Sequence, residues 1–383
     1  MKNKNNILIT MVILFLTFSF LGCVQNTSSP QKIAMKEIVD MRGVTVTIPS
    51  DPQRVVIVDK GFITQNIVAL GVQDKIVASG GMLSSENEKA EDRDSLYLFP
   101  KIIELPNVGY TFGGFNFETL ISVKPDLVLW ANSEYIKDNE ITKEAMDRIE
   151  NELKIPIVVI NTPGAYSNPT MNTQYEGIII LGKVFNKEKR AKEIHDITKK
   201  YVDMVYNRTK DIKDSEKPSV MYIGLKTDDS IGAVWGKNYG DAKFAEEICN
   251  IKNVYGESKS QLMSAEQIIT MNPDVIILAT NSILPDINIL STAPKYKPLQ
   301  NVNAVKNRRI GSFGLLTWWG DFKLDYPTIL LISAKTVYPE KFSDIKVNKW
   351  VNDYHKELYG LNDNQAQRLK EIQLLDWMDS NDF

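Results

Sequence analysis

Short apolar runs bounded by turn-forming residues alternate with stretches of helical periodicity along most of the chain. The apolar runs are nearly continuous in valine, isoleucine and leucine, which is typical of strands buried on both faces of a parallel sheet. The stretches between them repeat apolar residues at three-to-four spacing, as helices that cover such a sheet do. The predicted strands are 54–59, 75–81, 126–131, 155–162, 219–225, 275–280 and 308–314. The predicted helices are 62–71, 117–124, 141–153, 239–249 and 264–271.

A long segment without glycine or proline divides this pattern into two halves. Residues 187–214 repeat apolar side chains at three-to-four spacing and predict one long amphipathic helix. The flanking halves, 37–186 and 215–345, predict two doubly wound α/β lobes with parallel-type sheets, joined by that helix and separated by a cleft. Residues 346–383 predict a helical C-terminal extension that packs on the second lobe.

Two segments of the chain repeat one motif, 148 residues apart. The segment 117–133, FETLISVKPDLVLWANS, aligns with 265–281, AEQIITMNPDVIILATN. In both segments a helix is expected to end at a Pro-Asp pair and to lead into a buried strand. The repeat indicates that the two lobes are built alike. The shared residues are Glu118 and Glu266, Ile121 and Ile269, Pro125 and Pro273, Asp126 and Asp274, and Ala131 and Ala279.

The N-terminus predicts export and attachment to a membrane. Two lysines precede an apolar run from Ile7 to Phe20, and Gly22–Cys23 resembles a lipoprotein cleavage site. The prediction is a signal peptide over 1–22 and a lipidated tether over 23–36 that begins at Cys23. The alternative is that the apolar run stays uncleaved as an anchor helix. Either reading places the protein on the extracytoplasmic face of the cell membrane.

Composition and charge exclude several other classes of protein. A net charge of −3 over 383 residues, without a basic stripe interleaved with aromatic residues, argues against a nucleic-acid partner. The only other cysteine, Cys249, is expected to be a buried hydrophobic residue. The stretch 109–114, GYTFGG, does not match a dinucleotide-binding loop, no Walker sequence occurs, and no Ser-His-Asp set fits the cleft. We therefore expect neither an enzyme nor a bound cofactor.

The sequence resembles the solute-binding lipoproteins of ABC importers for iron-siderophores, haem and cobalamin. The resemblance spans about 37–345 and rests on the lipoprotein start, the opening DMRGVTVTIPSDPQRVV, the doubled Pro-Asp motif and the long helix between the lobes. It implies a monomer that delivers its ligand to a permease dimer with a cytoplasmic ATPase. It also implies that Glu118 and Glu266 dock onto permease arginines. The alternative is that these acids only stabilise helix starts.

The ligand is expected beyond the carboxyl ends of the strands, where parallel sheets bind their ligands. The segment LTWWGD (316–321) is notable there, since two adjacent tryptophans in a polar loop suit a macrocycle or a chelate. The predicted cleft residues are Phe62, Met82, Tyr110, Phe112, Tyr166, Lys226, Trp235, Lys237, Trp318 and Trp319.

The scarcity of histidine narrows the choice of ligand. The two histidines, His195 and His355, lie in the connecting helix and the C-terminal extension, so no protein-only metal site is expected in the cleft. A metal held inside a chelate, such as a ferric siderophore, haem or corrinoid, is the favoured ligand. A molybdate or tungstate oxyanion is the alternative, and a surface lipoprotein without a transport role is a third reading. By resemblance, cobalamin contacts would fall at Phe112, Ala131 and Ser260, of which only Phe112 is aromatic.

Overall fold

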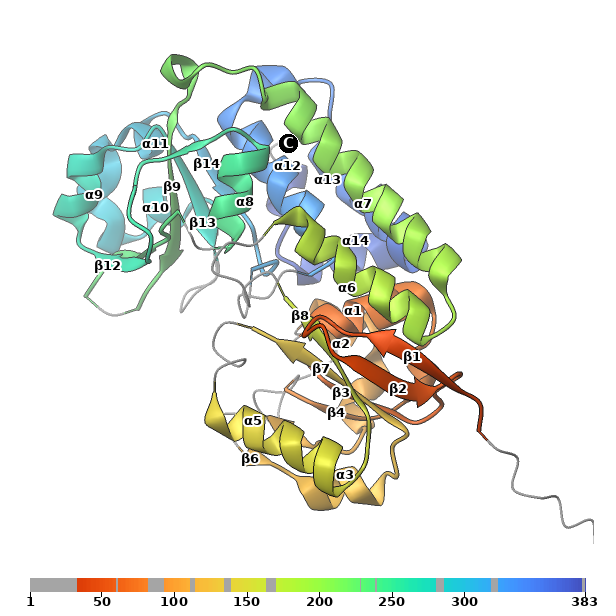
Figure 1. The fold of residues 1–383 in the computed structure, drawn as a ribbon. Coiled ribbons are helices and arrows are strands. Elements are labelled where there is room, and N and C mark those ends of the chain that lie inside the picture. The colour runs from red at the N-terminus through yellow and green to blue at the C-terminus, as the bar shows by residue number, and fades with distance from the viewer. Residues whose placement is uncertain are drawn as a thin grey trace, which may run out of the picture. The chain divides into compact units, whose positions relative to one another are not determined.

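Four parallel strands form the sheet of the N-terminal lobe in the computed structural model (Figure 1). Alternate residues of each strand enter different cores. Val55 and Ile57 face the core beneath the connecting helix, whereas Val56 and Val58 face the core on the opposite side. This two-residue period with both faces apolar explains why the strands read as unbroken runs. In spatial order the strands are β4 (Ile76–Gly80), β3 (Val55–Val58), β7 (Leu127–Asn132) and β8 (Ile157–Asn161).

Helices cover both faces of this sheet. Helix α1 ends at Gly71 in the left-handed conformation, as the sequence predicts for a glycine after the last periodic residue. A short two-stranded ladder, β5 with β6, lies beside the sheet. The elements are α1 (Phe62–Leu70), α2 (Asp94–Leu98), α3 (Phe117–Ser122), α5 (Glu140–Asp147) continued by a π-helical turn (Arg148–Glu152), α6 (Met171–Val184), β5 (Gly109–Tyr110), β6 (Gly114–Phe115), and 3-10 turns at Gln73–Lys75 and Pro100–Glu104.

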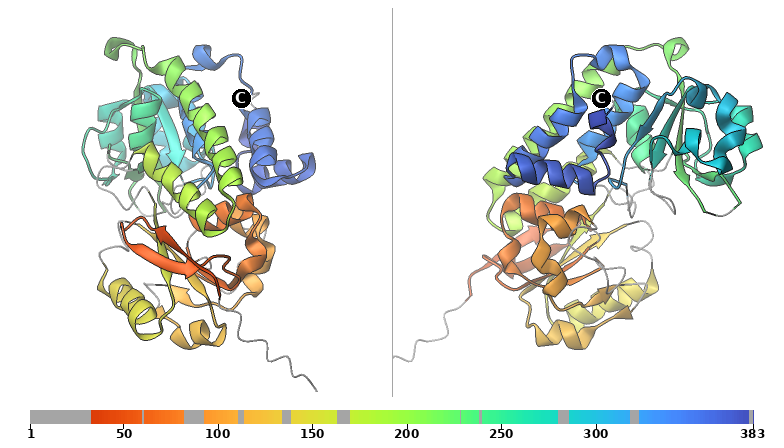
Figure 2. Two further views of the ribbon diagram at one scale, coloured as in Figure 1. Left: turned by 45° about the vertical axis from the view of Figure 1, so that its right-hand side comes forward. Right: turned by 180° about the vertical axis from the view of Figure 1, so that it is seen from behind.

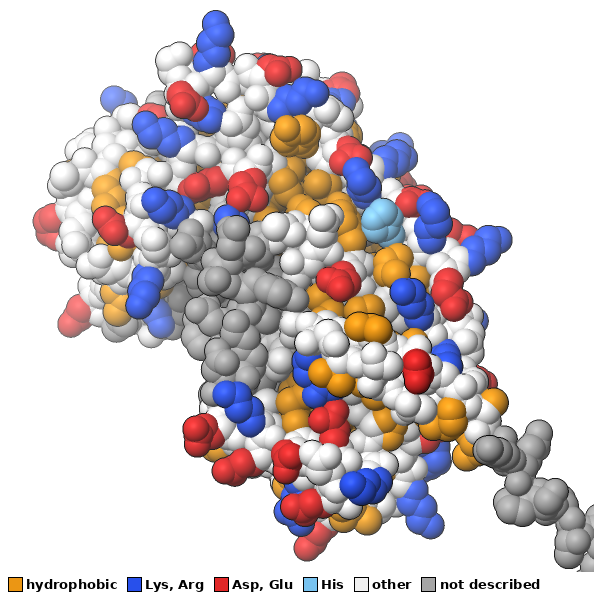
Figure 3. Space-filling model, viewed as in Figure 1, with side chains coloured by type: hydrophobic (Ala, Val, Ile, Leu, Met, Phe, Trp, Pro, Cys, Tyr) orange, Lys and Arg blue, Asp and Glu red, His pale blue; other side chains and the backbone are white. Residues whose placement is uncertain are grey.

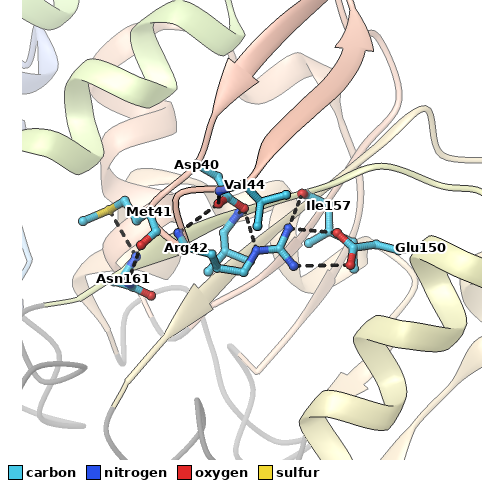
Figure 4. Close-up of polar contacts among 8 residues, drawn as sticks. Asp40, Met41, Arg42, Val44, Glu150, Ile157 and Asn161 are labelled. Atoms are coloured by element: carbon cyan, nitrogen blue, oxygen red, sulfur yellow. Dashed lines mark hydrogen bonds and ion pairs between the residues drawn. The ribbon is translucent and has the colours of Figure 1, made fainter.

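An antiparallel hairpin of β1 (Met35–Val39) and β2 (Thr45–Pro49) closes the edge of this sheet at β8 (Figure 4). In the turn of the hairpin, the Asp40 carboxylate accepts from the Val159 amide at 3.1 Å, and the Met41 amide donates to the Val159 carbonyl at 3.1 Å. Arg42 ties the turn further by donating to Glu150 at 2.8 Å. The turn thereby satisfies backbone groups that an open edge strand would expose.

The C-terminal lobe has a mixed sheet. Strands β9, β13 and β14 are parallel, as predicted, but β10 and β12 run antiparallel to their neighbours. The spatial order is β12 (Gln261–Met263), β10 (Gly232–Val234), β9 (Ser219–Leu225), β13 (Val275–Ala279) and β14 (Ile310–Ser312), with β11 (Lys252–Asn253) pairing β9. The helices are α8 (Gly240–Ile248), α9 (Ala265–Met271), α10 (Ile289–Thr292), α11 (Asn303–Lys306) and α12 (Tyr326–Val337), with 3-10 turns at Asp214–Glu216, Pro294–Asn301 and Pro339–Phe342.

Helix α7 (Glu188–Thr209) connects the two lobes within the range predicted for it. Its first half contributes Ala191 and Ile194 to the core of the N-terminal lobe, and its second half contributes Val202 and Val205 to that of the C-terminal lobe. A helix packed continuously into two cores resists bending at the connection.

The C-terminal helices pack on both lobes (Figure 2). The sequence predicts packing on the second lobe alone, so this part of the prediction is wrong. In α13 (Val347–Tyr359), Val347 and Val351 enter the core of the C-terminal lobe, while Tyr354 and Leu358 enter that of the N-terminal lobe. The remaining helices are α14 (Asp363–Ile372) and α15 (Trp377–Ser380).

The structure describes residues 33–59, 61–81, 93–110, 114–133, 139–162, 170–227, 229–237, 240–279, 286–317, 323–380 and 383. Residues 34–383 form one compact unit, which therefore begins within the predicted tether. The predicted signal peptide and Cys23 lie outside the described residues.

Candidate functional site

The two glutamates of the repeat occupy the same position in two equivalent helices. Helix α3 begins after Asn116, whose side chain accepts from the Thr119 amide, and α9 begins after Ser264, whose hydroxyl accepts from the Gln267 amide. Such side-chain caps satisfy amides at the helix start that lack a partner within the helix. Glu118 and Glu266 are therefore both the second residue of a capped helix, and both are exposed.

Electrostatics favour the charged form of Glu266. A hydrogen bond with Ser264 lowers the pKa of Glu266 below its ordinary value. The positive end of the dipole of α9 acts in the same direction on the Glu266 carboxylate, which lies in the first turn. Helix α9 therefore presents a carboxylate whose charge the local structure supports, and the carboxylates of Glu118 and Glu266 are both exposed to solvent and available to a cationic partner.

The Pro-Asp pairs of the repeat have a structural role that is the same in both lobes. The Asp126 carboxylate accepts from the amides of Gln53 and Arg54, at 2.8 and 3.0 Å, just before strand β3. The Asp274 carboxylate accepts from the amide and the hydroxyl of Ser219, at 3.0 and 2.9 Å, at the start of β9. Each aspartate thus fixes the start of the neighbouring strand. Although burial opposes it, hydrogen bonding with Ser219 lowers the pKa of Asp274.

A surface hollow of about 490 Å³ borders Glu118 on the N-terminal lobe. Its walls include Phe115, Phe117 and Arg148. The Arg148 guanidinium lies 4.1 Å from the centre of the Phe117 ring, in a cation–π contact. The acid on the N-terminal lobe is therefore at the rim of a concave surface with both apolar and charged groups.

The predicted ligand residues follow the carboxyl ends of strands, and many of them fall outside the part of the chain that the structure describes. In the N-terminal lobe the ends of β3, β4, β7 and β8 lie at one edge, because these strands are all parallel. Tyr110 is described by its backbone only, as the last residue of β5. Met82, Phe112, Tyr166, Trp318 and Trp319 lie outside the described residues.

Two predicted ligand residues are buried aromatic side chains. Phe62 is 0% exposed and belongs to the core of the N-terminal lobe, where Gly177 has no side chain and leaves room for its ring. Trp235 is 4% exposed and stacks on Tyr222 with ring centres 6.5 Å apart. In this structure both rings support the walls of the lobes and offer little surface to a ligand.

The structure does not bring Lys226 and Lys237 together at one edge of the sheet. Lys226 follows β9 at its carboxyl end, half-buried, and its carbonyl accepts from the Lys295 ammonium group. Strand β10 runs antiparallel to β9 and pairs Val234 with Ile223, so the chain after it returns toward the amino end of β9. Lys237 is exposed in that returning segment. The short antiparallel strand, which the sequence did not predict, separates the two lysines.

Glu246 on α8 is a titratable group whose environment raises its pKa to about 7. Burial is the main cause, and the positive charge of Lys237 acts in the opposite direction. Lys237 is thus electrostatically linked to a half-buried acid of its own lobe.

A buried polar network joins the two lobes, and it was not among the features predicted from the sequence. The Lys323 ammonium group donates to both carboxylate oxygens of Asp94, each at 2.9 Å. The Gln65 side-chain amide donates to Asp94 at 3.2 Å and to Asp325 at 3.1 Å, and its carbonyl accepts from the Leu324 amide at 2.9 Å.

The C-terminal helices join the same network. Gln373, which directly follows α14, donates to Asp325 at 3.0 Å. From α13, the Tyr354 hydroxyl donates to the Leu324 carbonyl at 2.7 Å. One sequence signal existed, because Gln65 and its neighbour Asn66 are polar in α1, a helix otherwise rich in apolar residues and buried almost all round.

The residues that prefer borderline metal ions are placed away from the strand ends. His195 lies on α7 and contacts the Tyr175 ring, with centroids 4.7 Å apart. His355 on α13 and Cys249, directly after α8, are both 0% exposed, and burial raises the pKa of the Cys249 thiol. Within the described ranges, no group of three or more His, Cys, Asp or Glu side chains is arranged to hold a metal ion.

A second hollow, of about 810 Å³, lies on a helical face of the protein. It is lined by residues of β1, α6 and α7, among them Val39, Ile179 and Ile180. Apolar side chains run along this face, with charged ones on either side (Figure 3). It is formed by helices and a hairpin strand, so it is distinct from the predicted cleft. None of the described helices is long and apolar enough to cross a membrane.

The comparisons with known proteins agree with this architecture. The sequence profile of a family described as periplasmic binding protein matches residues 56–312, which is more than half of the chain. The chain belongs to the periplasmic binding protein family. The resemblance inferred from the doubled Pro-Asp motif and the connecting helix is thereby confirmed. As a member of this family, the chain is an ABC transporter substrate-binding protein.

Relatives of known specificity do not agree on one ligand. The molybdate-binding protein MolA of Haemophilus influenzae is 24% identical over 88% of this chain and 95% of its own. The structure of MolA with molybdate superposes with a TM-score of 0.64 at 22% identity, covering 85% of this chain and 98% of MolA. The Fe(3+)-citrate-binding protein YfmC of Bacillus subtilis is 25% identical over 83% of this chain and 93% of its own.

A solved structure from Veillonella parvula is similar over almost the whole chain. The periplasmic solute binding protein from Veillonella parvula superposes with a TM-score of 0.71 at 21% identity, covering 91% of this chain and all 100% of its own. At this identity the likeness supports the fold of two α/β lobes and no particular ligand.

Proposed function

We propose that this protein captures a metal chelate, such as a ferric siderophore, haem or corrinoid, between its lobes and delivers it to an ABC permease. The observation that carries the proposal is the placement of the soft metal ligands. His355 and Cys249 are fully buried, and His195 lies on the connecting helix. A bare zinc or copper ion would prefer imidazole or thiolate. A metal that arrives with its own ligands needs neither, and a relative named for Fe(3+)-citrate supports this class.

A molybdate or tungstate oxyanion is the second candidate. The likeness to the molybdate-binding protein MolA over 88% of the chain favours it. An oxyanion would be bound by hydrogen-bond donors and positive charge, for which Lys226, with the Lys295 ammonium group on its carbonyl, is a candidate.

Delivery is proposed to use Glu118 and Glu266, which would pair with arginines of the permease dimer. Their exposure and their equal positions in two capped helices support this role. We further propose that Cys23 carries a lipid that holds the monomeric protein on the extracytoplasmic face of the membrane, with no catalytic activity. Mass spectrometry showing an unmodified N-terminus on soluble wild-type protein would refute the lipid anchor.

A thermal-shift screen tests the ligand class. The purified protein is heated with ferric siderophores, ferric citrate, haem, corrinoids, molybdate or tungstate. A ligand at 100 times its Kd stabilises the folded state by about 2.7 kcal/mol, which is a clear shift in midpoint. A shift with a chelate alone supports the first proposal, and a shift with molybdate or tungstate alone supports the second. No shift with any of them would contradict both.

A further inference from the structure

Each docking helix carries an exposed isoleucine one turn beyond its glutamate. Ile121 on α3 is 50% exposed, and Ile269 on α9 is 42% exposed. Residues three apart on a helix lie on the same face, so each isoleucine neighbours the glutamate of its own helix. The preceding residues, Leu120 and Ile268, are both 0% exposed and belong to the cores of their lobes. The core contacts of these helices are therefore made by Leu120 and Ile268, while Ile121 and Ile269 leave about half of their surface to solvent.

The same local frame presents both pairs. Each helix starts at a side-chain cap, has its glutamate second and its isoleucine fifth, and ends before a Pro-Asp pair that fixes the neighbouring strand. Other exposed apolar side chains, such as Val44 in the β1–β2 turn and Tyr206 in α7, lie in elements that occur once in the chain. The pair of a glutamate and an exposed isoleucine occurs in both lobes, which distinguishes it from isolated exposed apolar side chains.

We infer that Ile121 and Ile269 form the apolar half of the permease-docking surface, an inference that rests on the proposed transport function. A partner that binds both pairs must present the same receptor twice, as two copies of one chain do. Each copy would offer a cationic side chain beside an aliphatic patch. An aliphatic contact next to an ion pair excludes water from it, which strengthens the charge attraction and protects the contact from solvent.

The two surfaces differ in their surroundings. On the N-terminal lobe, the hollow lined by Phe115, Phe117 and Arg148 borders Glu118. On the C-terminal lobe, Leu262 on β12 is 51% exposed, shortly before the cap of α9. A permease of two identical subunits would therefore contact matched pairs that lie in two unlike surroundings, and because such a dimer is symmetric the two placements of the lobes on it are equivalent.

The test measures affinity for the importer's permease dimer in nanodiscs, using Ile121→Ser, Ile269→Ser and the double variant. Each single change should raise the Kd about tenfold, the equivalent of about 1.4 kcal/mol, and the double change about a hundredfold if the sites are independent. Ile121→Leu and Ile269→Leu should stay within about twofold of wild type, because they keep the aliphatic contact. Val44→Ser with Tyr206→Ser is the matched control and should not change the Kd.

The salt dependence of binding separates this inference from the docking role of the acids. The serine variants should bind the permease more weakly, but their affinity should decrease with salt as steeply as that of wild type. In the double variant Glu118→Ala with Glu266→Ala, affinity should depend less on salt. If only the glutamate variants weaken binding, the apolar contact is wrong and the docking proposal stands. If wild type does not bind the permease at all, both fail. A lower thermal midpoint in a serine variant would also overturn the inference, since the isoleucine would then be structural.

Discussion

Lys323 and Asp94 form a buried ion pair between segments 229 residues apart, with the ammonium nitrogen 2.9 Å from each carboxylate oxygen. Their side chains are 6% and 3% exposed. Asp94 begins α2 of the N-terminal lobe, and Lys323 lies shortly before α12 of the C-terminal lobe. Gln65 adds a hydrogen bond from α1 to the same carboxylate. The pair holds the two lobes to one another at a point that is almost completely buried.

Breaking this pair should cost much of the protein's stability. Asp94→Asn would leave the Lys323 charge buried without its counterion, so we expect a loss of about 3–5 kcal/mol in the free energy of unfolding, measured with urea. The double variant Asp94→Leu with Lys323→Met should recover part of this loss, since it removes both charges. Asp203→Ala is the control, because its pair with Lys199 is solvent-exposed and should contribute less than about 1 kcal/mol. Equal losses in Asp94→Asn and Asp203→Ala would contradict this account.

The aspartates of the repeat should govern stability and leave docking unchanged. Asp126→Asn or Asp274→Asn weakens charge-assisted hydrogen bonds to the start of the neighbouring strand, at a cost of about 1–2 kcal/mol each. Urea unfolding measures the loss, and permease binding of the folded variants should match wild type. A variant that keeps its stability but loses permease binding would place these aspartates in the docking surface instead.

The raised pKa of Glu246 on α8 predicts how the stability of the protein depends on pH. An acid whose folded-state pKa is raised binds its proton more tightly when folded, so stability falls as pH rises from the ordinary value of 4.5 toward 7. Glu246→Gln removes this term. The free energy of unfolding of Glu246→Gln, minus that of wild type, should therefore rise by about 1–2 kcal/mol between pH 4.5 and 8, allowing for solvent screening of a half-exposed group. Glu247→Gln changes an exposed neighbour on the same helix and is the control. Parallel pH profiles for wild type and Glu246→Gln would refute the prediction.

The elements that the sequence predicts well are those whose own residues decide them. Strands such as β7 and β13 are continuous apolar runs, and α7 has a clear three-to-four period over 22 residues. The antiparallel β10 and β12 have three residues each, too few for a period to be read. The apolar face of α13 can be read from the sequence. The sequence does not indicate that Tyr354 and Leu358 on this face pack on the N-terminal lobe. Likewise, no local pattern connects Asp94 with Lys323, because only the folded chain brings them together.

The candidate site divides in the same way. The positions of Glu118 and Glu266 could be predicted because the motif repeats and its helix caps are local. The prediction of the ligand residues assumes that all strands are parallel, and the reversed direction of β10 carries Lys237 away from Lys226. Phe62 follows a strand end but is turned into the core. The direction of a side chain at a strand end depends on packing, which periodicity does not report.

The adjacent tryptophans lie outside the described residues, and their role stays a prediction. If one of them contacts the chelate, Trp318→Ala or Trp319→Ala should weaken binding by about 1–3 kcal/mol, the order expected for a lost aromatic contact. The ligand for the titration is the compound with the largest thermal shift in the screen. Tyr206→Ala, an exposed aromatic change on α7, is the control. Wild-type affinity in both tryptophan variants would exclude an aromatic contact at these positions.

If Glu118 and Glu266 dock onto the permease as proposed, charge reversal at both should abolish uptake without affecting capture of the ligand. Glu118→Lys with Glu266→Lys replaces two attractive contacts by repulsion, so it should reduce uptake into proteoliposomes more than the double alanine variant does. The purified variant should stay folded and keep its ligand affinity, because both side chains are exposed. Glu193→Lys with Glu340→Lys makes the same change in net charge at exposed positions of α7 and a 3-10 turn, and should transport normally.

The same assay at rising salt adds a second readout, since exposed charges are screened beyond about 8–10 Å at physiological ionic strength. Uptake by wild type should fall with salt, while the double alanine variant should respond weakly. Normal uptake by the double lysine variant, or loss of ligand binding in either single one, would mean that the matched acids record only the common origin of the two lobes. The repeated isoleucines would then have no transport role to share.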